Sequence, residues 1–245
     1  MKDEPGAHVS NSDPRDRGPR ETAPSTDLYL ELLKRALLGL LSLRTVEPAV
    51  RGMGPGALRW ALQKLEPRLK TRNLAVIRQS TPRDIDRRLE GRGWPPEAYT
   101  MVGMRRLDNL QACIETAVGD GVPGDLIETG VWRGGATIFM RGVLKALGST
   151  DRTVWVADSF QGLAPPNPAL YPDDAGDAHH EENTLRVSLE QVRPHFARFD
   201  LLDEQVQFLE GWFRDTLHVA PIEQLAVLRL DGDMYESTWQ ALGVL

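Results

Sequence analysis

Residues 124–160, GDLIETGVWRGGATIFMRGVLKALGSTDRTVWVADSF, contain the pattern that decides the fold. The apolar run DLIET ends at a glycine, and GATIFMRGVLKAL follows with the spacing of a helix. RTVWVADSF is a second strand, which ends in an acid. Because strands that alternate with helices are typical of a parallel, doubly wound sheet, the stretch predicts an α/β protein.

The alternation continues on both sides of this stretch. Residues 104–118 predict a helix with Leu107, Leu110 and Ile114 on one side. Residues 188–202 predict another helix, which Pro194 should kink or restart. Residues 205–213 and 225–233 predict a third and a fourth strand of the same sheet.

The chain before residue 100 differs in composition and divides into two parts. Residues 1–26 contain no Leu, Ile or Phe, so we expect a disordered tail. Residues 27–99 predict a helical N-terminal extension, and residues 100–245 the α/β domain. The extension begins with an apolar stripe at helical spacing: Leu28, Leu32, Leu33, Ala36, Leu37, Leu40 and Leu41. The stripe must pack on the main domain or on a second subunit; we expect self-association and a homo-oligomer.

The composition excludes several classes of protein. A net charge of −6 gives no electrostatic reason to expect a nucleic acid or an anionic membrane as partner. The apolar run at residues 36–43 is too short to span a bilayer, and the start lacks the apolar core of a signal peptide. We therefore expect a cytoplasmic protein. Cys113 is the only cysteine, which excludes a disulfide framework, and we expect its thiol to be buried.

The first candidate binding motif is LIETGVWRGGATI, residues 126–138. Glycines let a ligand approach the backbone, and a helix N-terminus offers free N–H groups and a positive dipole. The G-x-x-x-G-G spacing does not match the dinucleotide fingerprint, and Glu128 would repel a pyrophosphate. Glu128 suits a cationic group, such as an α-amino group or a sulfonium. The alternative is a tight turn with an acid near the start of a helix.

Two further strand ends carry candidate binding residues. Asp158 closes the second strand, where a carboxylate can accept both hydroxyls of a ribose; the alternative is a helix cap or turn residue. Gly211 and Trp212 end the third strand, where an indole could flank a purine, although a core tryptophan is the commoner case. Since the carboxyl ends of parallel strands converge on one crevice, these motifs together indicate S-adenosylmethionine.

The fourth strand ends in LRLDGDMYES, which places Asp231 and Asp233 at the same crevice. Paired carboxylates suit Mg²⁺, although two turn aspartates are the alternative. The polar loop at residues 171–183, YPDDAGDAHHEEN, includes His179 and His180 and invites a metal or general-base interpretation. Loops of this composition are more often solvated, so we expect a substrate-facing lid without a catalytic role.

Four strings, in this order, resemble those of the macrocin O-methyltransferase family of antibiotic biosynthesis: LIETGVWRGGATIFMRG, ADSFQGL, FLEGWFRDTL and LAVLRLDGDMYEST. Residues 91–110 and 27–37 are also similar to that family, so the resemblance extends from about residue 27 to residue 245. It implies a Rossmann-like class I methyltransferase sheet and dependence on S-adenosylmethionine and Mg²⁺. The acceptor it implies is a sugar hydroxyl on a glycosylated natural product of macrolide or aminocoumarin type.

The resemblance also implies a role for each matching position. Glu128 and Gly130 would hold the methionine moiety, with Thr129 between them in the cofactor site. Asp158 would bind the ribose, while Ser159 and Phe160 would border the adenosine. Gly211 and Trp212 would lie by the adenine. Asp231 would bind the metal and take the proton of the acceptor, and residues 99–106 would help to cover the cofactor or substrate.

The sequence departs from the family pattern after residue 245. The family carries an Asp-Asp pair on its next strand, which completes the metal site, and then the last strands of the sheet. We therefore expect an incomplete metal site and no methyl transfer by these 245 residues alone. Two alternatives are a catalytically dead remnant that acts as a binding or oligomerisation module, and a nicotinamide-dependent oxidoreductase.

Overall fold

The computed structural model describes residues 24–41, 46–48 and 55–245. The N-terminal region contains α1 (Pro24–Leu37), β1 (Val46–Pro48), α2 (Ala57–Lys70), β2 (Ile77–Gln79) and α3 (Pro82–Leu89). The α/β region contains α4 (Met104–Gly119), β3 (Asp125–Thr129), α5 (Gly135–Leu147), β4 (Val154–Asp158), α6 (Leu189–Arg198), β5 (Val206–Glu210), α7 (Phe213–Thr216), β6 (Leu225–Leu230) and α8 (Tyr235–Leu242). Short 3-10 turns η2 (Pro172–Asp174), η3 (His179–Glu181), η4 (Asn183–Leu185) and η5 (Leu217–Val219) lie between them.

The main sheet has the strand order β5-β4-β3-β6, and all its pairs are parallel. The predicted strands and helices of the α/β region are therefore present. Within the described residues, β6 pairs with β3 alone and lies at an edge of the sheet. The register places Arg229 of β6 beside Glu128 of β3, which brings together residues far apart in the sequence.

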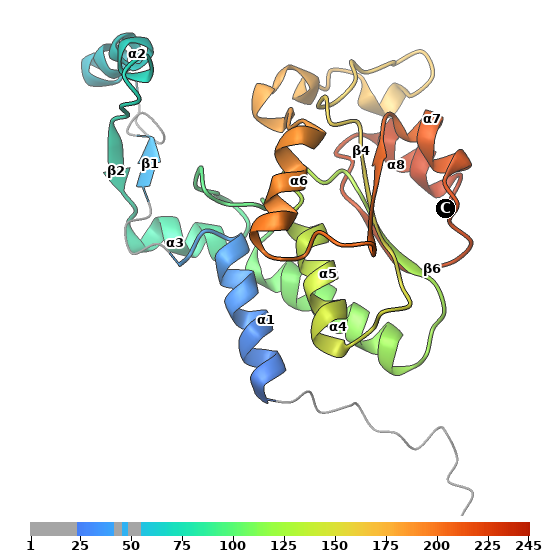
Figure 1. The fold of residues 1–245 in the computed structure, drawn as a ribbon. Coiled ribbons are helices and arrows are strands. Elements are labelled where there is room, and N and C mark those ends of the chain that lie inside the picture. The colour runs from blue at the N-terminus through green and yellow to red at the C-terminus, as the bar shows by residue number, and fades with distance from the viewer. Residues whose placement is uncertain (1–23, 42–45, 49–54) are drawn as a thin grey trace, which may run out of the picture.

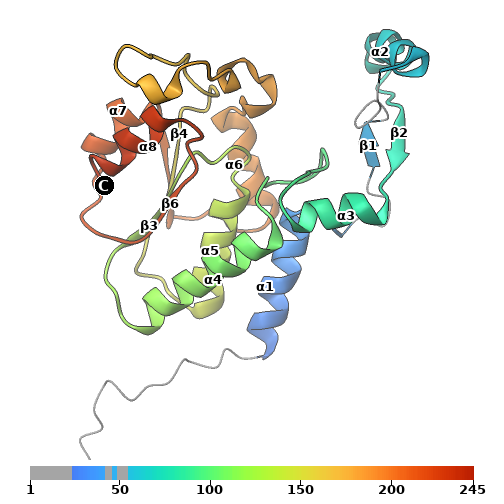
Figure 2. The same cartoon turned by 180° about the vertical axis from the view of Figure 1, so that it is seen from behind.

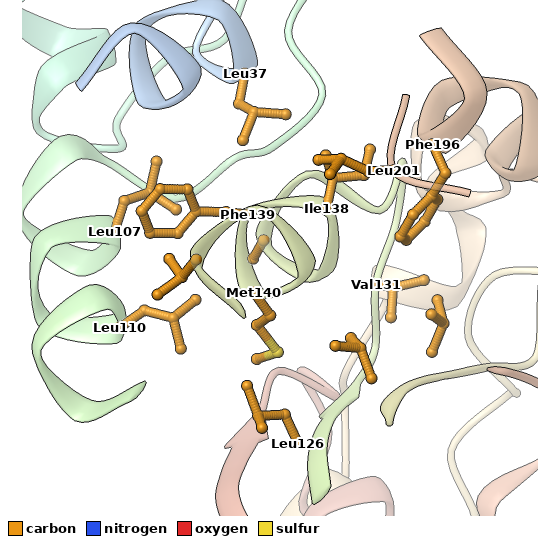
Figure 3. Packing of buried hydrophobic residues seen from close by; sticks show 14 of the residues in the cluster. Leu37, Leu107, Leu110, Leu126, Val131, Ile138, Phe139, Met140, Phe196 and Leu201 are labelled. Carbon is orange, nitrogen blue, oxygen red and sulfur yellow. The ribbon is translucent and has the colours of Figure 1, made fainter. Parts of the chain in front are cut away.

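Helices cover both faces of the sheet (Figure 1). Alternate strand residues such as Leu126, Val154 and Val156 face a core shared with α1, α4, α5 and α6. Ile127, Trp155 and Ala157 face the opposite side, where Leu217 and Ala241 cover them. Figure 3 shows α5 at the centre of the larger core, with Phe139 beside Leu107 of α4.

Helix α1 packs on α5 through one of its two apolar faces. Leu30, Leu33 and Leu37 are buried, and Gly142 of α5 lies so close to Leu33 that a side chain there would collide with it. Leu28 and Leu32 are 72% and 55% exposed, and Leu41 is also exposed, so these three residues do not pack on the domain, and their packing on a second subunit stays a prediction. In a helix, Leu28 and Leu32 point away from Leu30, Leu33 and Leu37, and spacing alone does not tell which side meets the domain.

The segment from β1 to β2, which includes α2, forms an arm that stands away from the rest of the molecule. β1 and β2 form an antiparallel pair, and α2 has no buried residue. Both views show α2 at the far end of this arm, well apart from the main sheet (Figures 1 and 2). Residues 1–23 of the predicted disordered tail lie outside the described residues.

Three local findings complete the fold. Helix α6 runs through Pro194 as one element from Leu189 to Arg198, so the predicted restart does not occur. Cys113 is exposed on α4 because the helix buries Leu107, Leu110 and Ile114 on its other side; the expectation of a buried thiol was wrong. No helix of the described residues is long and apolar enough to cross a membrane.

Candidate active site

One cavity of about 230 Å³ lies at the carboxyl ends of the strands. After β3, the chain adds β4 and β5 on one side and then returns to add β6 on the other, so the direction of the strand order changes between β3 and β6. Crevices at such switch points bind ligands in open α/β sheets. Gly130, Asp158, Gly211 and Asp231 each follow or end a strand and line the cavity.

Gly130 allows β3 and β6 to approach each other at the floor of this cavity. Its φ of 85° lies in the left-handed region, and a Cβ there would collide with the backbone of Asp231. The Asp231 amide donates to the Thr129 carbonyl at 2.9 Å, and the Gly130 amide donates to the Ala157 carbonyl at 2.9 Å. These two backbone bonds fix the Gly130 turn between the ends of β4 and β6.

Glu128 is a buried carboxylate inside the cavity wall. Its side chain accepts a hydrogen bond from the Thr137 hydroxyl at 2.7 Å and forms an ion pair with Arg229. Burial raises the pKa of Glu128 to about 7, while Arg229 and Thr137 act in the opposite direction. The group is therefore poised to change its charge near neutral pH, as ligand-binding and catalytic groups often are.

Arg229 bonds to both Glu128 and Asp231, for which the sequence predicts different roles. Its Nη1 contacts Glu128, and its Nη2 donates to Asp231 Oδ2 at 2.9 Å. Sequence reasoning did not identify Arg229. The available signal was a charged residue in the otherwise apolar strand LAVLRL, since such a residue needs a partner when it is enclosed.

Asp158 lies in the cavity wall with its carboxylate already hydrogen-bonded to the backbone. It accepts from the Val131 amide at 2.8 Å and the Phe160 amide at 2.7 Å. Burial raises the pKa of Asp158, and these N–H groups partly offset the effect. Both interpretations of Asp158 thus have a structural basis: it organises two loops, and it also lines the cavity.

The other predicted cofactor residues divide into two groups. Ser159, Gly211 and Trp212 line the cavity, as do Thr100, Met101, Val102 and Arg106 of the predicted covering segment. Thr129 and Phe160 are not among its lining residues. Phe160 is buried and packs beside Phe208, with the two ring centres 6.4 Å apart. Thr129 and Phe160 therefore support the wall from behind.

Asp231 and Asp233 both line the cavity, but they do not form a complete magnesium site. Mg²⁺ requires near-octahedral oxygen coordination, and one oxygen of Asp231 is already paired with Arg229. The described residues contain no group of three or more Asp, Glu, His or Cys side chains that could hold a metal. The donor set described here does not fit Mg²⁺ without further ligands.

The acidic loop is anchored to α8. Asp174 is buried and accepts hydrogen bonds from the Tyr235 and Glu236 amides at 2.8 and 2.9 Å. His179 contacts Asp177 at 2.8 Å, and this bond raises the pKa of the imidazole. His179 and His180 do not line the strand-end cavity.

Comparison with known proteins assigns the family. Residues 26–245 match the macrocin-O-methyltransferase (TylF) family. The chain is 58% identical over 166 residues to demethyldecarbamoylnovobiocin O-methyltransferase from Streptomyces niveus, covering 67% of this chain and 63% of that protein. It is 61% identical over 168 residues to 8-demethyl-8-(2,3-dimethoxy-alpha-L-rhamnosyl)-tetracenomycin-C 4'-O-methyltransferase from Streptomyces olivaceus, covering 65% and 61%. Mycinamicin III 3''-O-methyltransferase from Micromonospora griseorubida is 55% identical over 158 residues, with 63% and 62% covered.

The solved structure of the O-methyltransferase NovP has a TM-score of 0.67 and 43% identity to this chain, and covers 90% of it and 78% of NovP. The predicted Rossmann-like α/β fold is thereby confirmed. The matches with the three relatives span less than two thirds of each relative's own length. Because the family match extends over nearly the whole sequence, the chain belongs to the macrocin O-methyltransferase family.

Proposed function

We propose that the chain is an S-adenosylmethionine-dependent O-methyltransferase that acts on a sugar hydroxyl of a glycosylated natural product in antibiotic biosynthesis. The observation that carries the proposal is the buried carboxylate of Glu128 in the strand-end cavity, beside the Gly130 turn. A cationic ligand would favour the ionised form of this carboxylate. A nicotinamide dinucleotide would instead bring its negative pyrophosphate to the same place.

The lining residues fit each part of S-adenosylmethionine. Glu128 and Gly130 would hold the methionine moiety, while Asp158 and Ser159 would hold the ribose. Gly211 and Trp212 would lie by the adenine. Thr129 and Phe160 would contribute by supporting these residues. When bound, the cofactor supplies a methyl group on a sulfonium, and the chain's own residues hold and orient the acceptor hydroxyl.

The names of the relatives support the acceptor class. They are methyltransferases of a novobiocin precursor, of a rhamnosyl tetracenomycin and of a mycinamicin. We propose a macrolide, aminocoumarin or related glycoside as the substrate of this chain. The open, 42% exposed carboxylate of Asp231 lies at the cavity and is our candidate to accept the hydroxyl proton.

Magnesium is a further part of the proposal. Asp231 would be one ligand, with Asp233 close by, and the remaining ligands would come from outside the described donor set. A metal bound to Asp231 would change the hydrogen bonding of its carboxylate, because Arg229 donates to one of the two carboxylate oxygens. We therefore assign no catalytic step to the metal.

Isothermal titration calorimetry tests the cofactor assignment. We expect S-adenosylmethionine to bind and NAD to give no heat. Glu128→Ala should weaken binding by about 1–3 kcal/mol, the usual range for removing the partner of a charged group. Glu115→Ala is a suitable control, because Glu115 bonds Gln111 on α4 and does not line the cavity. Tight NAD binding would identify a nicotinamide enzyme, and no effect of Glu128→Ala would remove the basis of the proposal.

A radiolabelled-methyl assay tests the reaction itself. The acceptor would be a deoxysugar-bearing macrolide or an aminocoumarin, with Mg²⁺ or EDTA. The prediction that these 245 residues alone do not turn over remains a prediction; activity that EDTA abolishes would contradict it and show that the metal site is complete. Cofactor binding without turnover would be consistent with this prediction and with the dead binding module.

A further inference from the structure

A second cavity, of about 570 Å³, adjoins the strand-end cavity. The chain separates the two cavities at three places, where one residue lines the second cavity and its neighbour in the sequence lines the first. Tyr99, Arg133 and Thr184 line the second cavity, and Thr100, Trp132 and Leu185 line the first. The second cavity lies against helix α6, which contributes Gln191, Pro194, His195 and Arg198. Apart from Tyr99, at the edge of the predicted covering segment, it contains none of the residues proposed to hold the cofactor or a metal.

The walls of this cavity are strongly positive. Arg133, Arg186 and Arg198 line it, and Glu97 is the one carboxylate among its described lining residues. Three guanidinium charges against one carboxylate leave a net charge of about +2 when His195 is neutral. Burial lowers the pKa of His195 and favours the neutral imidazole; the hydrogen bond to the Arg133 carbonyl acts in the opposite direction, and the charges of Arg198 and Arg133 lower the pKa further.

The three arginines bond to neutral oxygens instead of carboxylates. Arg133 donates to the carbonyls of Pro96 and, at 2.8 Å, of Ala98. Arg186 donates to the His180 carbonyl at 3.2 Å, and Arg198 to the Tyr99 hydroxyl at 3.2 Å. Within the part of the chain that the structure describes, no ion pair joins any of the three to an acid. Arg133 also lies over the Trp132 ring, 4.3 Å from its centre, and is attracted by Glu97, so Arg186 and Arg198 are the charges most available to a ligand.

We propose that this cavity is a binding site for a phosphorylated small molecule, separate from the cofactor site. A phosphate monoester carries a charge of about −1.5 to −2 at neutral pH, which matches the net charge of the walls. A ligand with one carboxylate would neutralise only about half of that net charge. Planar guanidinium groups recognise phosphate through paired N–H donors.

The size of the cavity favours an ester over the free ion. Ligand cavities in proteins typically measure about 300–1,000 Å³, and this one lies within that range. A phosphate group fills only a small part of it. Tyr99, Val187 and Pro194 add apolar surface beside the arginines, and the Tyr99 ring is held edge-to-face against His195 with 4.9 Å between ring centres.

Calorimetry on the full chain at low salt tests the proposal, with glucose 1-phosphate as the probe and inorganic phosphate and acetate as comparison arms. We expect glucose 1-phosphate to bind and acetate not to bind. The double variant Arg186→Gln/Arg198→Gln should bind glucose 1-phosphate at least about tenfold more weakly, since two charged hydrogen-bond donors are lost. Both side chains are exposed, so the melting temperature should be unchanged.

Arg193→Gln is the matched control. Arg193 lies on the same helix, but its guanidinium stacks on Phe208, 4.8 Å from the ring centre, and it does not line the cavity. We expect this variant to keep its affinity. Inorganic phosphate binding as tightly as the ester, with the same loss in the double variant, supports the site with free phosphate as ligand. Absence of binding by either phosphate, or equal weakening by Arg193→Gln, would overturn the proposal.

Discussion

We predict that Glu128 makes the binding of S-adenosylmethionine sensitive to pH. Burial raises its pKa to about 7, so the carboxyl group is largely protonated below that pH. A cationic ligand favours the ionised form, and binding below pH 7 must therefore release a proton. We expect S-adenosylmethionine affinity to rise about tenfold per pH unit up to pH 7 and then to level off. Titration calorimetry from pH 5.5 to 8.5 measures this, and a flat profile would contradict it. Glu128→Gln should remove the slope.

Arg229 provides the charge that Glu128 needs inside the protein. Its side chain is 15% exposed and that of Glu128 is 3% exposed, so neither charge is well solvated without the other. Arg229→Met should cost about 3–5 kcal/mol of unfolding free energy, because it leaves a buried carboxylate unpaired. Urea denaturation measures the loss. The double variant Glu128→Gln/Arg229→Met should recover most of it; if the two losses simply add, the ion pair is not the cause.

At this scale, the sequence indicated which strand-end residues line the cavity, although their binding roles stay predictions, and it did not indicate their partners. Glu128, Gly130, Asp158, Trp212 and Asp231 each follow from a local pattern, an apolar run that ends in an acid, a glycine or an indole. The pairing of Glu128 with Arg229 depends on the register of two strands 101 residues apart. Phe160 was expected at the cofactor, but its φ of 55° accompanies a ring that is packed in the core. The spacing of residues in the sequence indicates neither how two strands align nor which residue takes a left-handed backbone conformation.

The Asp174 side chain hydrogen-bonds the loop at residues 171–183 to helix α8, and the Tyr171 ring lies beside the Tyr235 ring with 6.4 Å between their centres. Asp174 accepts from the first two amides of α8, in the manner of an N-cap supplied by a distant segment. Asp174→Ala should cost about 1–2 kcal/mol, the range found for the loss of a helix cap. Hydrogen exchange should become faster at the Tyr235 and Glu236 amides. Asp173→Ala, at an exposed neighbouring position, is the control, and equal exchange in both variants would contradict the role.

The order of strands and helices followed from sequence because each element has its own periodicity. Apolar runs such as residues 125–129 and 154–158 are bounded by glycine or acid, and α5 has an apolar repeat between them. Helix α6 shows the limit of such rules. Its capping box at Ser188 and Gln191, with Val192 and Phe196 buried, compensates for the hydrogen bond that Pro194 removes. The packing of α6 on the core therefore outweighs the local effect of Pro194.

Across the whole molecule, the predicted N-terminal extension contains two different structures. Helix α1 belongs to the core of the α/β region: besides its buried leucines, Lys34 reaches Asp108 of α4 at 2.5 Å. Helix α2 has no buried residue within the described chain. The sequence did not distinguish them, because both have leucines at helical spacing. The boundary predicted at residues 99 and 100 stays a prediction.

The exposed arm gives the predicted self-association a specific location. Leu58, Trp60 and Leu65 are 62%, 60% and 42% exposed on α2. A 14-residue helix without tertiary packing is marginal in water, so a second copy of the chain is the partner we expect to cover it. Leu58→Ser/Trp60→Ser/Leu65→Ser should lower the mass found by light scattering to that of a monomer. Leu28→Ser/Leu32→Ser tests the outer face of α1 in the same way. If only the α1 variant dissociates, the contact lies on α1; if neither variant changes the mass, the N-terminal region does not mediate assembly.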